Sequence, residues 1–367
     1  MAYLYIEIAD KIRKEITEGN YAADTLLPTE YQLMEKYGIS RQTVRNALSV
    51  LKGEGVLYQI HGSGTYVKKQ IQEETPEESP QAKKDDPAPV RTAGRNRKVI
   101  GVLCTYISNY IFPSIIRGIE RRLSAAEADL RLASTENRVD LERQLLLRFL
   151  DEPVDGLIVE GTKTTLPSPN IDLYMKLKEL GTKLVFIHSC YPELSDEVLV
   201  GMDDTAGGRM AVNELIQAGC RSLAGIFKND DIQGIRRYAG FTEGVRDGGL
   251  LFDDRKIKWF NTEESAAGIW KDADALGSFL DKVTGVVCYN DSAAIDLTES
   301  MRRFGISRKL GIVSFDRSPY SSFMSGMICL VHPQEKLGMA AADKILSLIE
   351  GNEEASEIMQ WTVDRIV

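Results

Sequence analysis

Polar side chains that could hold a hydroxyl-rich molecule follow several apolar, strand-like runs in the C-terminal part of the chain. In open α/β sheets, ligands bind beyond the carboxyl ends of the strands, so these positions are the first candidates for a site. They are Tyr106, Ser108, Tyr110, Glu160, His188, Arg237, Asp291 and Asp316. Charged groups hydrogen-bond hydroxyls and aromatic rings pack on apolar ligand faces. The set predicts a site for a sugar.

Each of these residues also has a purely structural interpretation. A single acid after a strand can cap the following helix, and we expect this role for Asp204, which follows Asp203. His188 could be an internal histidine with its hydrogen bonds satisfied. Arg237, beside Arg236, could belong to a surface ion pair. Residue type and position alone leave these alternatives open.

A second group of residues, near the N-terminus, could contact DNA. The segment that Ser40 caps predicts a helix with an apolar side formed by Val44, Ala47, Leu48 and Leu51. Its other side is polar and consists of Gln42, Arg45, Asn46 and Ser49, with Arg41 at the border. Guanidinium and amide groups can reach base edges and phosphates in a major groove. A polar helix face can equally be only solvated, so the pattern by itself leaves both interpretations open.

The elements around this helix predict a winged helix-turn-helix. Apolar residues at four-residue spacing predict a first helix over residues 8–16. A second helix is expected over residues 30–37, with Thr29 as its N-cap and Gly38 as its stop. Two β-like runs, 56–60 and 65–67, are joined by the glycine-containing turn 61–64, which predicts a hairpin.

The remainder of the chain alternates strand-like and helical segments. Strands are expected at 99–104, 130–133, 156–159, 184–187, 223–227, 286–289 and 312–315. Helices are expected at 112–128, 141–150, 174–180, 206–218, 234–248 and 293–304. Alternation of this kind indicates parallel sheets, and two rounds of it indicate two lobes in an α/β fold.

A proline-rich, charged segment separates the two parts. The formal net charge is −9, and it divides into +1 for residues 1–70, −4 for 71–90, +4 for 91–98 and −10 for the rest. We therefore expect three regions: a DNA-binding domain at 1–70, a flexible linker at 71–97 and a ligand-binding and dimerisation domain at 98–367. An acidic body behind a near-neutral head suits a protein that meets DNA through its head alone.

The head resembles the GntR-type DNA-binding domain. The resemblance lies in three segments that occur in order, Leu27–Glu30, Ser40–Arg45 and Gly62–Val67. Together they favour DNA binding over a solvated helix face. The resemblance implies DNA-contacting roles for Glu30, Arg41, Thr43, Arg45, Gly62 and Gly64, with His61 at the tip of the wing; Ser40 and Gln42 complete the predicted DNA-binding set.

The body resembles the LacI/GalR effector domain, a type I periplasmic-binding-protein fold. The resemblance covers residues 98–367 and lies in Met202–Asp204, Leu215–Gly219, Arg237–Phe241, Tyr289–Asp291 and Ile312–Asp316. It implies that Arg237 and Asp291 hold sugar hydroxyls. The pairing of this body with a GntR-type head, together with Thr105–Pro113, resembles arabinose-responsive repressors of Gram-positive bacteria, which implies L-arabinose as the inducer. We expect a homodimer that binds double-stranded operator DNA and is released by the sugar.

Enzymatic function and a metal site are poorly supported by the sequence. The three histidines, His61, His188 and His332, are far apart, and no HExxH, GxSxG or P-loop motif occurs. The five cysteines never form a CxxC pair, so we expect reduced thiols, no zinc and no cofactor beyond the effector. The chain shows no apolar run of membrane-spanning length and no signal-peptide pattern at its start, so a cytoplasmic protein without a membrane partner is expected.

Three alternatives remain for the function. The regulator could respond to a different sugar or to a sugar phosphate. The body could resemble a pyridoxal-phosphate enzyme behind a GntR head, although nothing marks the Schiff-base lysine that such a body needs. A plain sugar-binding protein is the third, and the DNA-binding head argues against it.

Overall fold

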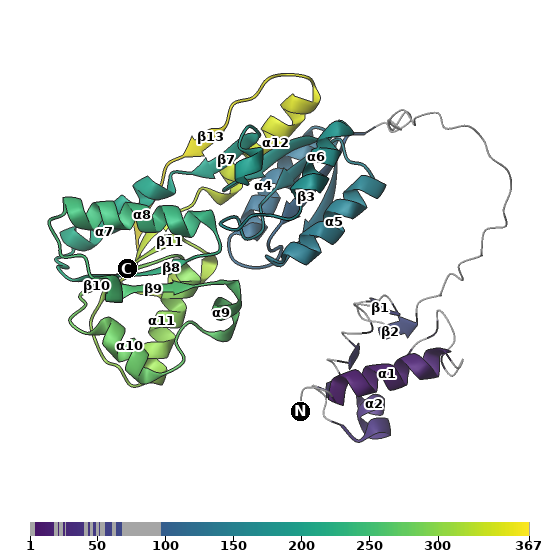
Figure 1. The fold of residues 1–367 in the computed structure, drawn as a ribbon, viewed down its shortest axis with the longest axis horizontal. Helices are drawn as coiled ribbons and strands as arrows, with labels where there is room; N and C mark the ends of the chain where they lie inside the picture. Colours follow the sequence, from purple (N-terminus) through teal and green to yellow (C-terminus); the bar gives the residue numbers. More distant parts are fainter. Residues whose placement is uncertain are drawn as a thin grey trace. The chain divides into compact units, whose positions relative to one another are not determined.

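The chain divides into two compact units, with the division between Asp86 and Pro87. The computed structural model describes residues 4–17, 21, 25, 27–39, 43–44, 47–48, 51, 56–60, 64–67 and 97–366. Figure 1 shows a small helical unit with a short hairpin and a larger α/β unit. Each unit is described by itself.

The smaller unit contains the predicted helices. α1 spans Leu4–Thr17 and α2 spans Glu30–Tyr37. Thr29 caps α2 by accepting a hydrogen bond from the backbone N–H of Gln32, and Gly38 ends it with a φ of 65°. The described residues of the third helix have helical backbone, and its predicted apolar side is buried: Val44, Ala47, Leu48 and Leu51.

The predicted hairpin of the smaller unit is confirmed. β1 (Leu57–Ile60) pairs with β2 (Gly64–Val67) in antiparallel register, with Leu57 opposite Val67. Thr43 lies in the third helix and Gly64 begins β2. Glu30 begins α2. Six residues of the predicted DNA-binding set lie outside the described residues: Ser40, Arg41, Gln42, Arg45, His61 and Gly62.

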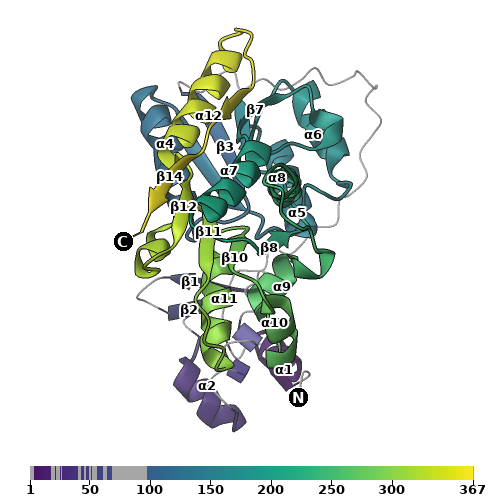
Figure 2. The ribbon, with the colours of Figure 1, turned by 90° about the vertical axis from the view of Figure 1, so that its left-hand side faces the viewer.

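The larger unit contains two six-stranded sheets, each forming the centre of one lobe (Figure 2). The first lobe, here the N-lobe, has the strand order β13-β7-β6-β5-β3-β4, and all its pairings are parallel. Its strands are β3 (Val99–Cys104), β4 (Asp129–Ser134), β5 (Gly156–Val159), β6 (Lys183–Ile187), β7 (Val198–Met202) and β13 (Glu357–Met359). Its helices are α4 (Phe112–Ala125), α5 (Val139–Asp151), α6 (Ile171–Glu179) and α12 (Gln334–Ile349).

The second lobe, here the C-lobe, has the strand order β14-β12-β11-β10-β8-β9, parallel except for the edge pair β12–β14. Its strands are β8 (Leu223–Lys228), β9 (Ile257–Phe260), β10 (Gly285–Cys288), β11 (Gly311–Asp316), β12 (Ile328–Val331) and β14 (Thr362–Arg365). Its helices are α7 (Asp204–Gln217), α8 (Ile232–Asp247), α9 (Thr262–Ala267), α10 (Ala273–Leu280) and α11 (Asp291–Arg303). Three short 3₁₀ turns, Pro192–Leu194, Asp254–Lys256 and Pro319–Phe323, lie in connecting loops.

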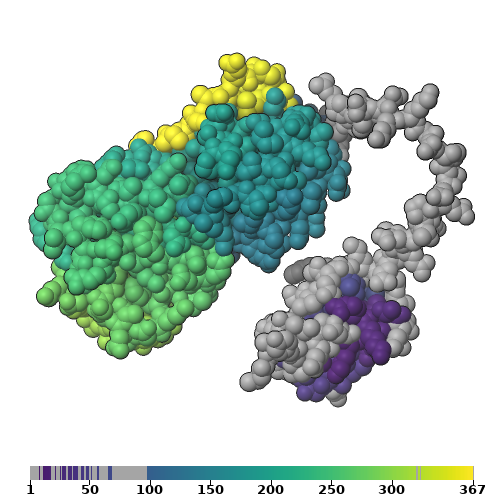
Figure 3. Space-filling model, viewed as in Figure 1, coloured from purple at the N-terminus to yellow at the C-terminus, as the bar shows by residue number. Residues whose placement is uncertain are grey.

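The chain crosses between the lobes at three described places. The first crossover joins β7 to α7, the second joins β12 to α12, and the third joins β13 to β14. In Figure 3 the C-terminal segment, in yellow, covers part of the N-lobe surface. Because α12 and β13 return to the N-lobe and β14 returns to the C-lobe, neither lobe is one continuous piece of chain.

The two-lobed α/β fold agrees with the prediction, and every strand and helix predicted for the body is present within a few residues of its expected ends. The sequence interpretation did not include β7, β9, β12, β13 and β14 or the helices α9, α10 and α12. The missed strands have three to five residues, and β13 pairs with β7, which lies far away in the sequence.

Candidate ligand-binding cleft

A cleft of about 710 Å³ lies between the lobes of the larger unit. Its lining comes from segments that follow β3, β4, β5 and β6 in the N-lobe and β8, β9, β10, β11 and β12 in the C-lobe. A volume of this size is typical of small-molecule sites. The cleft therefore lies at the carboxyl ends of the strands of both sheets, where parallel α/β sheets bind ligands.

Arg237 of α8 is the central cation of the cleft floor. Its Nε donates to Oδ1 of Asp204 at 2.8 Å, and Nη1 donates to the backbone oxygen of Tyr289 at 2.6 Å. Nη1 and Nη2 lie 3.4 and 3.3 Å from the two carboxylate oxygens of Asp316. Burial would lower the pKa of Arg237, but the charges of Asp316 and Asp204 raise it. The guanidinium is thus charged and held in place.

Close packing of α7 against α8 fixes the backbone that carries Arg237. A Cβ added at Gly208 would lie 2.2 Å from the backbone oxygen of Arg237, and one at Gly240 would lie 2.0 Å from that of Thr205. Only glycine permits such a close approach of two helices. Two glycines, Gly208 and Gly240, therefore set the position of the α8 backbone that carries Arg237.

Asp316 links the two lobes at the cleft floor. It ends β11 with a φ of 86°, and its carboxylate accepts a hydrogen bond from the hydroxyl of Tyr110 in the N-lobe. Tyr110 also has a positive φ, 66°. Such backbone conformations are uncommon for residues with a Cβ and gather at functional sites. Both residues direct their polar ends to the region between the lobes.

A chain of buried polar groups runs from Glu160 through His188 to His332. Oε1 of Glu160 lies 2.9 Å from Nδ1 of His188, and the Nε2 atoms of the two histidines are 3.2 Å apart. Burial would lower the pKa of His188, but the hydrogen bond and charge of Glu160 raise it. Burial and the neighbouring charges of His188 and Arg237 hold the pKa of His332 well below its usual value. The proton shared by the two Nε2 atoms is therefore favoured on His188, the ring with the higher pKa.

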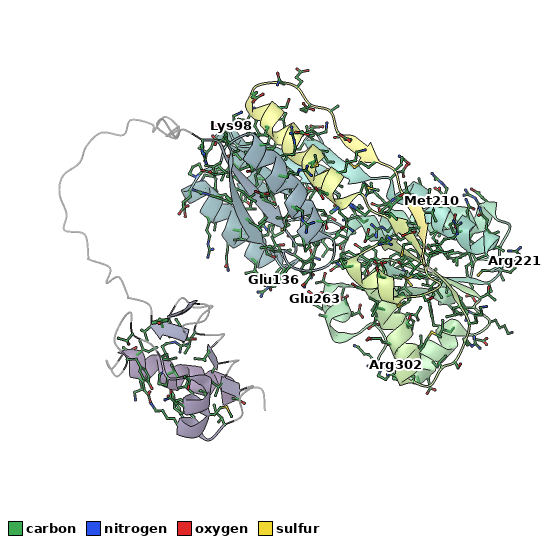
Figure 4. All side chains as sticks on the ribbon, turned by 180° about the vertical axis from the view of Figure 1, so that it is seen from behind. Lys98, Glu136, Met210, Arg221, Glu263 and Arg302 are labelled. Carbon is green, nitrogen blue, oxygen red and sulfur yellow. The ribbon has the colours of Figure 1, made fainter. Side chains whose placement is uncertain are left out.

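The rim of the cleft carries direct contacts between the lobes. Asn137 Nδ2 lies 2.6 Å from the hydroxyl oxygen of Thr262, and Lys163 pairs with Glu263 at 2.6 Å. Figure 4 labels Glu136 and Glu263, which come from the two lobes and lie near each other at this boundary. These contacts depend on how closely the lobes approach.

The structure brings seven of the eight predicted sugar-site residues to this one cleft: Tyr106, Ser108, Tyr110, Glu160, His188, Arg237 and Asp316. Asp291 is the exception. It is fully buried at the start of α11, and its carboxylate accepts hydrogen bonds from the hydroxyl of Ser314 and the backbone N–H of Ser318. Asp291 therefore supports the loop that carries Asp316, and it is not among the residues that line the cleft.

The expected role of Asp204 as a helix cap is wrong. Asp203 is the N-cap of α7, since its side chain accepts a hydrogen bond from Ala206 N–H at 2.8 Å. Asp204 is the first helical residue, and its carboxylate pairs with Arg237. Sequence reasoning could not see this pair because the two residues are on separate helices.

Several cleft residues were missed by the sequence interpretation. His332 directly follows β12, and Lys228 is the last residue of β8, so the same strand-end rule would have found both once these strands were assigned fully. Lys228 forms ion pairs with Asp230 and Asp231, at 3.1 and 2.5 Å. Asn137 follows β4 at a positive φ of 54°, and no sequence pattern marked it.

The described residues hold neither a metal-site cluster nor a membrane-spanning helix. No group of three or more histidine, cysteine, aspartate or glutamate residues in them has the arrangement of a metal site. Among the same residues, no helix combines the length and the apolar character needed to cross a membrane.

Comparison with known proteins identifies both units. Residues 4–67 match the family model "Bacterial regulatory proteins, gntR family", and residues 212–365 match "Periplasmic binding protein-like domain". The arabinose metabolism transcriptional repressor of Halalkalibacterium halodurans is 35% identical over 352 residues, covering 94% of this chain and 89% of the relative. That of Geobacillus stearothermophilus is 34% identical, covering 94% and 91%.

The chain belongs to the family of arabinose metabolism transcriptional repressors. As in the predicted architecture, a GntR-type head and a LacI/GalR-type body are joined in one arabinose-family repressor. The body also matches the structure of a periplasmic binding protein/LacI transcriptional regulator from Alkaliphilus metalliredigens, complexed with D-xylulofuranose, with a TM-score of 0.62. That match has 21% identity and covers 73% of this chain and 97% of the other, which establishes the fold of the body.

Proposed function

We propose that this repressor binds operator DNA as a homodimer through its GntR-type heads and releases it when L-arabinose enters the cleft between its lobes. The observation that carries the proposal is the convergence of seven predicted sugar-site residues on one interlobe cleft, in a member of the arabinose repressor family. The chemistry in the cleft is that of binding.

The lining of the cleft suits a neutral polyol. Arg237 and Asp316 offer paired donors and acceptors to hydroxyl groups, and Tyr106 contributes a partly exposed ring. Charge-assisted hydrogen bonds of this kind are stronger than neutral ones. Tyr106 packs edge-on against Phe112 at 5.8 Å, which supports an aromatic wall on the N-lobe side.

The charges in the cleft favour an unphosphorylated sugar over a sugar phosphate. Its lining contains the carboxylates of Glu136, Glu160, Asp231 and Asp316. The lysine and the arginine of the lining are each already paired with two carboxylates, Lys228 with Asp230 and Asp231 and Arg237 with Asp204 and Asp316. A phosphate dianion would have to displace these partners, at a cost in free energy.

Release of DNA follows from linkage between the two binding events. The lobes touch at the floor through Tyr110 and Asp316 and at the rim through Asn137 and Thr262. A sugar that prefers the closed lobes shifts the protein toward that state, and weakens operator binding only as far as that preference extends. In a two-fold dimer the operator carries a matching pseudo-palindrome.

A thermal-shift screen of sugars tests the ligand. L-Arabinose should raise the melting temperature in proportion to the logarithm of its concentration, because it binds the folded state. D-Ribose, D-xylose and arabinose 5-phosphate serve as comparison ligands. A larger shift with the phosphate would overturn the charge argument, and no shift with any of the sugars would remove the cleft as the effector site.

Analytical ultracentrifugation of the full chain, with and without an operator duplex, tests the dimer. The proposal expects a mass of two chains per duplex. A single chain on a full-length operator would contradict it.

A further inference from the structure

The three crossovers between the lobes converge on one aromatic side chain, Trp361. This residue lies in the third crossover, between β13 and β14, and is 4% exposed. Its ring centroid is 5.7 Å from that of His332 in the second crossover. The first turn of α7, at the first crossover, reaches it through Gly207, where an added Cβ would come within 2.7 Å of the indole. Trp361 thus contacts both other crossovers.

Trp361 also packs against the cation of the cleft floor. The guanidinium carbon of Arg237 lies 5.1 Å from the Trp361 ring and 4.4 Å from the ring of Phe315. Phe315 in turn packs edge-on against Trp361 at 5.1 Å. Arg237 is therefore enclosed between the cleft on one side and the crossovers on the other. A ligand that moves the guanidinium acts directly on Trp361.

Each crossover region carries one buried polar atom that has no hydrogen-bond partner among the described residues. These atoms are Oδ2 of Asp204, Nδ1 of His332 and Nε1 of Trp361. An unsatisfied buried donor or acceptor costs free energy, so a rearrangement that pairs any of them recovers part of that cost. The crossovers are therefore suited to a second arrangement, and transmission between sites requires such a two-state element.

We propose that Trp361 is a positioning residue that couples sugar binding at Arg237 to the hinge formed by the three crossovers. The inference rests on the proposed function, in which the sugar occupies the cleft. Trp361 lies outside the cleft lining and contacts residues of the other two crossovers, so its proposed role is in transmission and not in holding the sugar.

The test uses Trp361→Phe in the full-length protein, with Trp270→Phe as a matched control. Trp270 is also 4% exposed, and its Nε1 also has no partner among the described residues, but it packs on Phe279 in the separate core of the C-lobe. Three quantities are measured for each variant: L-arabinose affinity by calorimetry, operator affinity with and without saturating L-arabinose, and the change in tryptophan emission when L-arabinose is added.

We expect Trp361→Phe to keep L-arabinose affinity within about threefold of wild type, while the ratio of operator affinities without and with sugar falls at least about fivefold. The sugar-dependent emission change should be lost in Trp361→Phe and kept in Trp270→Phe. Thermal unfolding is compared first, and Trp361→Tyr replaces the phenylalanine variant if that variant does not fold.

The inference is overturned if the ratio of operator affinities without and with sugar is the same in Trp361→Phe as in wild type. It is also overturned if this ratio falls equally in Trp270→Phe. If the wild-type protein binds L-arabinose and releases its operator, and Trp361→Phe does so to the same extent, the inference is overturned but the proposed function stands. A wild-type protein that shows no response to L-arabinose overturns the proposed function, and the inference with it.

Discussion

The Nε2 atom of His188 lies 3.2 Å from the Nε2 atom of His332, which joins the end of an N-lobe strand to the crossover that follows the C-lobe strand β12. In this hydrogen bond one ring must donate and the other must accept, so one proton lies between the two Nε2 atoms. Glu160 fixes which ring holds it, since its carboxylate lies against Nδ1 of His188. The hydrogen bond between the two rings therefore depends on the protonation of His188.

Glu160→Gln should reduce stability in a pH-dependent way. Because the pKa of His188 is raised above 6.5 in the folded protein, its stabilisation is fully present below pH 6.5 and is lost as the pH rises through the raised pKa. We expect the variant to lose about 1–3 kcal/mol in its free energy of unfolding near pH 6 and less near pH 9. Denaturant unfolding across that range measures it.

Glu263→Gln is the matched control for this prediction, because Glu263 is 63% exposed and pairs with a lysine. Its effect should be small and constant across the range. A loss in Glu160→Gln that does not change with pH would refute the assigned proton.

Asp316→Asn and Asp291→Asn should separate ligand contact from loop support. Asp316 lines the cleft and pairs with Arg237, so its replacement should weaken L-arabinose binding by about 1.5–3 kcal/mol, roughly tenfold or more. Asp291 lies behind the cleft, so its replacement should mainly lower the melting temperature. Calorimetry and thermal unfolding distinguish the two, and an equal loss of sugar affinity would return Asp291 to the site.

Asn137→Ala should speed the release of sugar. The side chain joins the lobes through Thr262 and also accepts from the backbone N–H of Lys163 at 2.9 Å. Losing an interlobe hydrogen bond worth about 0.5–1.5 kcal/mol should raise the dissociation rate several-fold. Stopped-flow fluorescence measures this rate. Asn352→Ala, a surface control, should leave it unchanged, and an unaltered rate in Asn137→Ala would exclude the rim as a closing contact.

Arg45→Ala should weaken operator binding by about 1–3 kcal/mol or more and leave sugar binding intact. The expectation comes from the polar side of the third helix and from the GntR resemblance, since Arg45 lies outside the described residues. Gel-shift titration checks it, with Arg246→Ala on the surface of the body as control. Wild-type operator affinity in Arg45→Ala would refute this placement of the recognition surface.

The sequence was sufficient to predict the fold where the pattern is local. Alternating apolar and helical segments gave the strands and helices on either side of Glu160 and His188, and the strand-end rule then gave seven cleft residues. The same rule missed His332 because β12 was not assigned. The spacing of Leu337, Ala341 and Ile345 is present in the sequence and would have indicated α12.

What could not be predicted depends on which segments meet in space. The ion pair of Asp204 with Arg237 joins two helices, and β14 completes the sheet of β12 from the far end of the chain. Trp361 directly precedes β14 and packs on Arg237, so its position depends on both of these long-range contacts. The sequence does not decide the direction of the Asp291 side chain, because an acid at the end of a strand can point into a cleft or back into its own loop. The hydrogen bonds from Ser314 and Ser318 show that it points back into the loop.

Operator binding as a function of L-arabinose concentration, measured by fluorescence anisotropy on the full-length protein, tests the central claim most directly. We expect the sugar to weaken operator affinity at least about fivefold in wild type and to have no effect on Arg237→Ala, which should still bind the operator. An operator affinity that L-arabinose leaves unchanged in the wild-type protein would contradict the account.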